Sequence, residues 1–380
     1  MKTRPSRIDQ FVASFMPRDA ISTECDLMRH MINERGYGSE IFSEQWHQVF
    51  DKYCNHLFNY GALADNEKNI VISHYSIGSS MPYFLKGIRA FKIIRNHNIT
   101  PPKFFAWDKQ LGQYFESTKY GLAQSEMVFN GADLVWSDSL YNAESFNVPE
   151  SRSIVLPVIR DYARISTLKD VDDLARRLND GRKNILFVGR MTPNKAQHDL
   201  LFLLKHIHTH IDSSVRLIMV GCQALPTYAP MVFDLAQKLG FSVDKEIGSP
   251  HADKVDVLAP GSIDERDMAT YYRHADAFVC LSEHEGFCVP LVEAMFFGLP
   301  IVAHASSAVP ETLGSGGLII DKNDPVTTLA AMKAVLGDKG FAAQLRQKSC
   351  ERAKDFSWVT LGKLFSNALA QSIDFFEKTE

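Results

Sequence analysis

Short apolar runs alternate with amphipathic stretches along the whole chain, and this alternation predicts strands and helices in turn. In the first half, helical patterns cover residues 20–36, where Gly36 ends the helix, and residues 140–146. Pro101 and Pro102 prevent the apolar stretch before them from continuing as a helix. The predicted strands of this half lie within residues 8–15, 39–44, 69–76, 90–102 and 132–139.

A second series of strands follows the polar stretch 167–184, which suits a connecting segment and a helix. The runs are nearly continuous in apolar residues, as is typical of parallel strands that are buried on both faces. Alternation of such strands with helices predicts an α/β protein whose parallel sheets carry helices on both sides. The runs of the second series lie at residues 185–190, 215–221, 255–261, 277–282, 299–304 and 316–321.

The two series predict two doubly wound domains. A chain of 380 residues exceeds the size at which one hydrophobic core keeps growing. We expect a Rossmann-like N-terminal domain at residues 1–166 and a second Rossmann-like domain at residues 167–357. The amphipathic pattern at residues 358–380 predicts a C-terminal helix that packs back on the N-terminal domain.

The predicted strands tend to end in His, Ser, Asp or Asn. Parallel sheets of this class bind their ligands at the carboxyl ends of the strands. The polar strand ends are therefore candidate site residues.

Composition limits the classes of partner. The net charge is -4, so no basic field attracts nucleic acid, and we expect no nucleic-acid partner. The six cysteines form no C-x-x-C pair, which indicates reduced thiols in a cytoplasmic protein. No apolar run is long enough to span a bilayer. Lys2, Arg4 and Arg7 could touch anionic headgroups at the inner face of the cytoplasmic membrane, although such clusters are more often solvated termini.

The stretch "SEHEGFCVPLVEAMFFG", residues 282–298, carries two carboxylates, Glu285 and Glu293. Its pattern predicts a loop that leads from a strand to a helix, with Glu285 at the strand end and Glu293 in the first helical turn. The amides of residues 286–289 would meet the start of that helix, where unpaired donors and the helix dipole favour an anion. From the residues alone, Glu293 could equally compensate the helix dipole and Glu285 could be a surface carboxylate.

The stretch resembles the E-x7-E motif of the retaining nucleotide-sugar glycosyltransferases of family 4. The resemblance continues through residues 261–282 and 298–320. It implies a GT-B fold, in which two Rossmann-like domains face a cleft and the N-terminal domain binds the acceptor. It also implies that Glu285 contacts hydroxyls of the donor sugar, that Glu293 holds the ribose, and that the donor meets the loop formed by Gly286, Phe287, Cys288 and Val289.

Arg190 follows a predicted strand and Lys195 precedes a helix. Two fixed cations at a strand end can neutralise a diphosphate and stabilise the charge that grows on a leaving group. A lone Arg and Lys are more often solvated surface residues. The resemblance implies that they are the Arg/Lys pair that binds the diphosphate.

In the first half, His74 and His97 stand at predicted strand ends. A single histidine is more often structural than catalytic. The resemblance implies a histidine near the donor sugar, and we expect His97 in this role and His74 as the second candidate. Ser137 and Asn142 could line the cleft, or equally form a helix cap and a buried contact.

The first strand-to-helix loop contains no glycine, unlike the glycine-rich loop of many relatives. Arg18 and Asp19 are instead the candidates to meet the acceptor there.

We expect no metal and no other cofactor. The one D-x-D sequence, Asp170 to Asp172, lies in the charged connector and is expected to cap a helix. No G-x-G-x-x-G follows the first strand, which disfavours a dinucleotide-dependent oxidoreductase, and no G-x-S-x-G elbow is present.

The resemblance is strongest to mannosyltransferases that build bacterial surface polysaccharides, including lipopolysaccharide. We therefore expect transfer of mannose from GDP-mannose to a saccharide or lipid-linked saccharide, with retention by the front-face mechanism that the resemblance implies. A UDP-sugar donor and a catalytically silent GT-B scaffold are the alternatives. Nothing resembles a pyridoxal-phosphate lysine site, which disfavours a phosphorylase.

Overall fold

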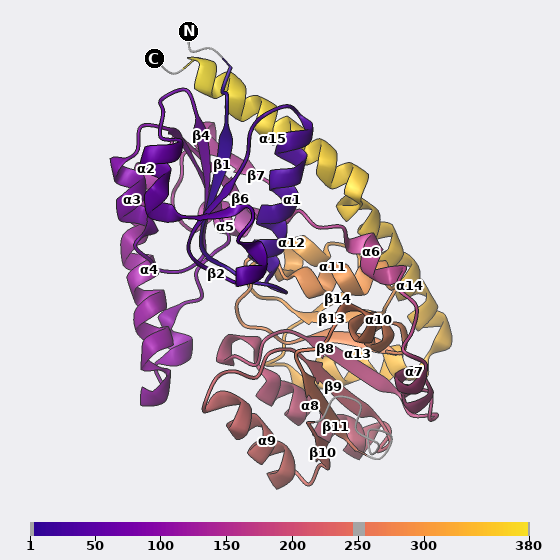
Figure 1. Ribbon diagram of the computed structural model, residues 1–380. Helices are drawn as coiled ribbons and strands as arrows, with labels where there is room; N and C mark the ends of the chain where they lie inside the picture. The colour runs from indigo at the N-terminus through magenta and orange to yellow at the C-terminus, as the bar shows by residue number, and fades with distance from the viewer. Residues whose placement is uncertain (1–3, 246–254, 379–380) are drawn as a thin grey trace. The chain divides into compact units, whose positions relative to one another are not determined.

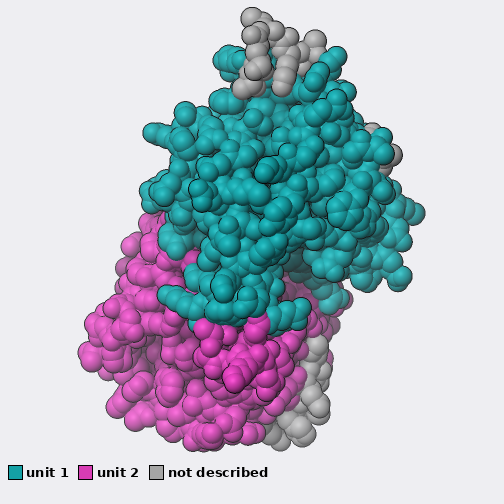
Figure 2. Space-filling model, turned by 90° about the vertical axis from the view of Figure 1, so that its left-hand side faces the viewer, with its two compact units in different colours: residues 1–103, 113–160, 358–380 teal, residues 104–112, 161–357 magenta. Residues whose placement is uncertain are grey.

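The computed structural model describes residues 4–245 and 255–378, and the chain separates into two compact units (Figure 2). Unit 1 consists of residues 1–103, 113–160 and 358–380, and unit 2 consists of residues 104–112 and 161–357. Residues 104–112 therefore group with unit 2, although the sequence places them inside the N-terminal domain. Lys2 of the N-terminal basic cluster lies outside the described residues.

Unit 1 is built on a parallel sheet of seven strands. These are β1 (Ile8–Phe15), β2 (Ile41–Trp46), β3 (Cys54–His56), β4 (Ile70–Tyr75), β5 (Phe91–Asn96), β6 (Leu134–Ser137) and β7 (Ser153–Val155). Their order in the sheet is β3-β2-β1-β4-β5-β6-β7. The order reverses between β1 and β4, so the chain winds outward from this point in both directions.

Helices cover both faces of this sheet. They are α1 (Ala20–Glu34), α2 (Tyr60–Leu63), α3 (Met81–Gly87), α4 (Gly112–Asn130), α5 (Leu140–Glu144) and α15 (Trp358–Lys378). Figure 1 shows α1 and α15 on one side and α2, α3 and α4 on the other. Successive strand residues point to opposite faces, so Phe11 packs with Tyr60 and Leu85 while Val12 packs with Cys25.

The C-terminal helix α15 is part of unit 1. The indole Nε1 of Trp136 on β6 donates a hydrogen bond of 3.1 Å to Ser372 Oγ, and the ring of Phe91 on β5 meets Phe376 edge-on. Phe376 and Trp136 are both completely buried. The helix therefore closes part of the core of unit 1.

Unit 2 contains a second parallel sheet of seven strands. These are β8 (Asn184–Val188), β9 (Arg216–Val220), β10 (Val243–Asp244), β11 (Val257–Gly261), β12 (Ala277–Cys280), β13 (Ile301–His304) and β14 (Leu318–Ile320). Their order is β10-β11-β9-β8-β12-β13-β14, so the winding direction reverses between β8 and β12. The two doubly wound parallel sheets confirm the α/β class that the hydrophobic pattern predicts.

The helices of unit 2 form one group on each side of its sheet. They are α6 (Tyr162–Ser166), α7 (Asp172–Leu178), α8 (Gln197–His210), α9 (Tyr228–Lys238), α10 (Glu265–Arg273), α11 (Val289–Phe296), α12 (Val309–Leu313), α13 (Pro325–Gly337) and α14 (Lys339–Ala353). Helix α8 packs on α9 and α13, whereas α10 and α11 both pack on α6. No helix within residues 4–245 and 255–378 is long and apolar enough to cross a membrane.

Candidate functional site

The winding direction in unit 2 reverses at the neighbouring strands β8 and β12. The chain leaves β8 towards β9 on one side and leaves β12 towards β13 on the other. The two loops that follow these strands therefore diverge, and in open α/β sheets this is where ligands bind. Arg190 and Lys195 lie on the first loop, and Glu285 lies on the second.

An ion pair joins these two loops. Lys195 Nζ lies 2.6 Å from both carboxylate oxygens of Glu285. The Lys195 side chain is 19% exposed and that of Glu285 is 7% exposed. Burial lowers the pKa of Lys195, but the Glu285 carboxylate, together with the nearby Cys288 and Cys280, outweighs burial and the net pKa is raised. Lys195 is therefore a fixed positive charge at this edge of the sheet.

The backbone around Glu285 is held from several sides. The Glu285 amide donates to Ser307 Oγ (2.7 Å), and the Glu285 carbonyl accepts from the Ala308 amide (3.3 Å). Asn194, next to Lys195, donates from its side chain to the His284 carbonyl (3.2 Å) and accepts the Glu283 amide on its own carbonyl (2.8 Å). The loop is thus fixed to the Lys195 loop by backbone contacts as well as by the ion pair.

The loop after Glu285 leads into α11. Cys288 is the N-cap of this helix and has a positive φ of 73°, which is strained for a residue with a Cβ. Within the described parts of the chain, the amides of Phe287, Cys288 and Val289 have no hydrogen-bond partner. These donors lie at the start of a helix, where an anion is stabilised.

Glu293 is the fifth residue of α11, just beyond the expected first turn, because the helix already begins at Val289. Glu293 is only 5% exposed, and its Oε2 accepts a hydrogen bond of 2.8 Å from the Tyr272 hydroxyl. The carboxylate is therefore oriented by a second helix, α10, rather than solvated at the surface. Glu293 is therefore not a surface side chain that compensates the helix dipole.

Arg190 lies immediately beyond β8 and is exposed. Its guanidinium has no hydrogen bond or ion pair among the residues that the structure describes. The strand ends approach closely here: a Cβ at Gly221, whose φ is +148°, would lie 2.0 Å from the Gly189 carbonyl oxygen. Only glycine fits at position 221, and this close approach fixes the backbone from which Arg190 projects.

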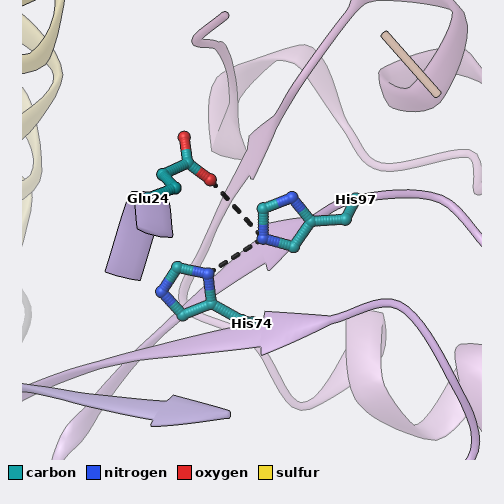
Figure 3. Close-up of side chains that lie close together, drawn as sticks. All are labelled: Glu24, His74 and His97. Atoms are coloured by element: carbon teal, nitrogen blue, oxygen red, sulfur yellow. Dashed lines mark hydrogen bonds and ion pairs between the residues drawn. The ribbon is translucent and has the colours of Figure 1, made fainter. Parts of the chain in front are cut away.

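In unit 1 the strand ends converge on a buried polar cluster, shown in part in Figure 3. His74 on β4 and His97 after β5 lie side by side, with His74 Nδ1 2.9 Å from His97 Nε2. His97 Nδ1 lies 3.0 Å from Asp138 Oδ2, and Glu24 Oε2 of α1 lies 3.7 Å from His97 Nε2. Both histidine candidates thus belong to one cluster.

Ser137 and Asn142 are completely buried in unit 1. The side chain of Asn96 donates to Ser137 Oγ (3.4 Å) and to the Asn142 carbonyl (3.0 Å). The N-cap of α5 is Ser139 and not Ser137. Both residues therefore make buried contacts within unit 1, and their expected role in lining a cleft stays a prediction.

Arg18 and Asp19 are exposed on the loop before α1. Asp19 is the N-cap of α1, and its Oδ2 accepts from the Ser22 amide and hydroxyl, both at 2.9 Å. Arg18 has a positive φ of 64°. The Asp19 carboxylate thus has a local structural partner, while the role of both residues towards an acceptor stays a prediction.

Two groups of side chains in the described residues are compact enough to raise the question of a metal ion, namely Glu24, His74 and His97, and Cys280, Glu285 and Cys288. In the first, the rings are nearly coplanar (11°) and their nitrogens face head-on at 2.9 Å, whereas tetrahedral zinc ligands lie about 3.3 Å apart with converging lone pairs. In the second, Lys195 occupies both Glu285 oxygens. Neither group suits an ion.

Asp170 does not cap α7, contrary to expectation. Its carboxylate binds Arg273 and lies 2.9 Å from His274 Nε2. Val171 occupies the N-cap position without a side-chain hydrogen bond, and Asp172 is the first residue of the helix. Asp170 is therefore part of a structural ion pair.

Four polar residues of these clusters are missed by sequence reasoning: Glu24, Arg95, Asp138 and Tyr272. Arg95 could have been identified from the sequence, because a charged residue inside the apolar run of β5 requires a buried partner. Asp138 belongs to the polar end of a predicted strand. Glu24 and Tyr272 lie in ordinary helical patterns, and only tertiary structure reveals their contacts.

The comparison with known families decides the class of unit 2. Residues 170–355 match the family described as Glycosyl transferases group 1. This segment is a glycosyl transferase group 1 domain. The group 1 domain contains both loops of the switch point, and thus Arg190, Lys195, Glu285 and Glu293.

Two relatives are similar to part of the chain. The D-inositol 3-phosphate glycosyltransferase of Corynebacterium kroppenstedtii is 29% identical over 194 residues, which cover 50% of this chain and 40% of the relative. The O-antigen chain mannosyltransferase B of Escherichia coli is 34% identical over 98 residues, which cover 26% of each chain. The matched region thus spans less than half the length of these relatives.

The fold extends beyond the group 1 domain. The structure of HepE from Anabaena, solved in complex with UDP-glucose, is similar with a TM-score of 0.72 at 16% identity, over 96% of this chain and 99% of HepE. The fold is therefore GT-B, the expected class.

Proposed function

We propose that the chain is a retaining glycosyltransferase that moves mannose from GDP-mannose to a saccharide or lipid-linked saccharide in surface-polysaccharide synthesis. The observation that carries this proposal is the Lys195–Glu285 ion pair at the switch point of the group 1 domain. It joins a cation suited to a diphosphate with a carboxylate suited to sugar hydroxyls on two loops that diverge. The proposal includes a cytoplasmic location, with the acceptor at the inner face of the membrane.

The donor contacts follow from the chemistry of each group. Arg190 is exposed and its guanidinium has no partner among the described residues, so it is available to phosphate oxygens. Lys195 already carries its charge, and the open amides of Phe287 and Cys288 add hydrogen-bond donors. Glu293, oriented by Tyr272, accepts hydrogen bonds from the ribose diol.

In the reaction, the bond between the sugar C1 and the phosphate oxygen breaks, and the acceptor oxygen bonds to C1 on the same face. The departing phosphate takes the acceptor proton. Negative charge grows on the diphosphate, where Lys195 and Arg190 stabilise it. Glu285 holds the sugar by its hydroxyls while its ion pair with Lys195 keeps the carboxylate in place.

Mannose is favoured by the relative named O-antigen chain mannosyltransferase B. A UDP-sugar is the second candidate, because HepE was solved with UDP-glucose. A thermal-shift panel of GDP, GDP-mannose, UDP and UDP-glucose separates them, since a ligand that binds only the folded chain raises its Tm. We expect GDP and GDP-mannose to raise the Tm, and we expect GDP to be released in the presence of a mannose-terminated acceptor. A rise in Tm with UDP and UDP-glucose alone would mean that the donor is a UDP-sugar.

Turnover must be measured together with binding. Analysis of the product by NMR is expected to give the anomeric configuration of the donor, and inversion would exclude the retaining reaction. A chain that binds nucleotide but transfers no sugar to any of a panel of acceptors would be a binding scaffold. Activity is expected to persist in excess EDTA, because two cations and the loop amides neutralise the diphosphate; a loss that Mg²⁺ restores would contradict this.

A further inference from the structure

The buried cluster of unit 1 contains more charge than a structural histidine requires. Glu24 and Arg95 are completely buried, and the side chains of His97 and Asp138 are each 4% exposed. They come from α1, from β5 and the loop after it, and from the loop after β6. Figure 3 shows Glu24 and His74 on either side of the inner edge of the His97 ring.

The outer nitrogens of both rings carry hydrogens. Gln10 donates its side-chain amide to the Cys25 carbonyl (2.8 Å), so its Oε1 faces His74 Nε2 at 3.0 Å and can only accept. Asp138 Oδ2 faces His97 Nδ1 at 3.0 Å, and a carboxylate likewise accepts. The network therefore assigns N–H to His74 Nε2 and to His97 Nδ1.

The inner nitrogens then face each other as two lone pairs, unless a proton lies between them. His74 Nδ1 and His97 Nε2 are 2.9 Å apart, a hydrogen-bond distance. The ring centroids are 5.1 Å apart and the ring planes differ by 11°, so the two nitrogens meet head-on. A hydrogen bond in this geometry needs one proton, which gives the two rings three N–H protons in total. One ring is then an imidazolium.

The charges of the side chains around the two rings also require a proton between His74 and His97. Glu24 and Asp138 are two carboxylates, and Arg95 is one cation, with its Nη2 2.7 Å from an oxygen of each. Arg95 also donates to the Leu156 carbonyl (2.7 Å), and the Ile159 amide donates to Glu24 (2.7 Å). Without the proton, the buried cluster would hold one unbalanced negative charge, which is costly in a low dielectric.

The extra proton belongs to His97. It has Asp138 on one side and Glu24 on the other, whereas His74 meets the neutral amide of Gln10. Burial holds the pKa of His74 well below its usual value, and the charges of His97 and Arg95 act in the same direction. His74 is thus a neutral acceptor.

We propose that Glu24, Asp138 and His74 are positioning residues that hold His97 as an imidazolium. Both ring N–H groups of His97 are then engaged, one by Asp138 and one by His74. His97 has no lone pair with which to deprotonate an acceptor, so its contribution to the reaction is a fixed position and charge. This last point rests on the proposed function; the protonation state does not.

The direct test is ¹⁵N NMR of the full chain labelled at histidine, at pH 7.5 and without donor or acceptor. One ring is expected to show two protonated nitrogens and its neighbour a neutral Nε2–H tautomer. His97→Gln assigns the first set of signals and His74→Gln the second. Neutral signals from both rings in the wild-type chain would overturn the proposal, as would stoichiometric binding of added Zn²⁺ that shifts both.

Glu24→Gln tests the role of charge. It removes one carboxylate charge at nearly constant shape, so His97 is expected to lose its extra proton and show neutral-ring signals. The matched control is Asp180→Asn, which removes a carboxylate from Arg216, another fully buried arginine, in unit 2 and away from these rings. This control is expected to leave the signals of both rings unchanged. An unchanged imidazolium in folded Glu24→Gln would contradict the role of Glu24.

The effect on turnover is a separate readout. In Glu24→Gln, kcat is expected to fall by about 100-fold, the lower end of the effect of losing one fixed electrostatic stabiliser, while the Kd for the nucleotide sugar stays the same. An equal change in Kd and kcat would mean that the variant is only destabilised. An imidazolium seen by NMR in a chain that transfers no sugar would leave the protonation state standing and refute the proposed function.

Discussion

The two units have the same winding pattern, yet the charges at the carboxyl ends of their strands are arranged differently. In unit 1, Arg95 is completely buried and contacts two carboxylates and two backbone carbonyls. In unit 2, Arg190 at the corresponding sheet edge is exposed, and its guanidinium has no partner among the described residues. Lys195 has one carboxylate partner, and its side chain is 19% exposed.

This difference separates a structural cluster from a ligand site. A buried charge needs partners for its whole hydrogen-bonding capacity, and Arg95 has them within its own unit. The cations of unit 2 leave capacity for an incoming anion. Substitutions in the charged cluster of unit 1 are therefore expected to lower stability. Substitutions of the cations of unit 2 are expected to lower activity rather than stability.

Glu24→Ala is expected to have the largest effect on stability. It leaves the buried Arg95 without the carboxylate that accepts from its Nε and Nη2, and the Ile159 amide without its acceptor, at a cost of about 3–5 kcal/mol in the free energy of unfolding. Urea denaturation measures the change. Glu34→Ala on the exposed face of the same helix is the control and is expected to change stability by less than about 0.5 kcal/mol. Equal effects of the two substitutions would contradict the role of the cluster.

Lys195→Ala is expected to reduce kcat by about 10²- to 10³-fold, because a cation that stabilises the leaving group is lost. The circular dichroism spectrum should stay that of the wild type. Lys195→Arg keeps the charge and is expected to recover part of the activity. Full turnover of Lys195→Ala would remove this residue from the site.

Glu293→Ala is expected to weaken nucleoside diphosphate binding by about 1.5–3 kcal/mol, since hydrogen bonds to a charged acceptor are lost. Calorimetry gives the affinity. Tyr272→Phe removes only the hydroxyl that orients Glu293, and its effect is expected to be smaller, about 0.5–1.5 kcal/mol. Unchanged affinity for GDP and UDP in Glu293→Ala would refute the ribose role.

Cys288→Gly is expected to be more stable than Cys288→Ala by about 1 kcal/mol, because only glycine relieves the positive φ of 73°. Both substitutions remove the same thiol, so their difference isolates the backbone strain. Thermal unfolding measures it. A more stable alanine variant would show that the backbone at this N-cap relaxes without glycine.

The smallest effect concerns pH. The pKa of Lys195 is raised in the folded chain, so its contribution to stability is fully present below the unfolded value of 10.5 and is lost as the pH rises through the folded value. The difference in stability between the wild type and Lys195→Met should therefore stay constant from pH 7 to pH 10 and shrink above it. A decline already below pH 9 would indicate another titrating group.

The hydrophobic pattern predicts most of the sheet framework, because buried parallel strands are long apolar runs. Strand β1 spans Ile8–Phe15, as predicted, and the predicted helix from residue 20 ends before Gly36, whose φ is +83°. The short edge strands β3, β7 and β10 lack such runs and are missed. Helix α4 is missed as well, since polar and apolar residues are mixed around it.

The site is predicted less completely. Motif spacing identifies Glu285, Glu293, Arg190 and Lys195 as candidates, because each stands at a strand end or in the adjoining helix. The ion pair between Lys195 and Glu285 is invisible in the sequence, since 90 positions separate the two residues. The same applies to Glu24, which lies 71 positions from Arg95.

The packing of α15 on unit 1 has a consequence for synthesis on the ribosome. Phe91 and Trp136 are translated before residues 161–357 of unit 2, whereas the helix residues that cover them, Phe376 and Phe365, are translated after these. The nascent first sheet therefore keeps an apolar face open while all of unit 2 is made. Unit 1 is thus begun before residues 161–357 and completed after them, and chaperones would find its open apolar face in that interval.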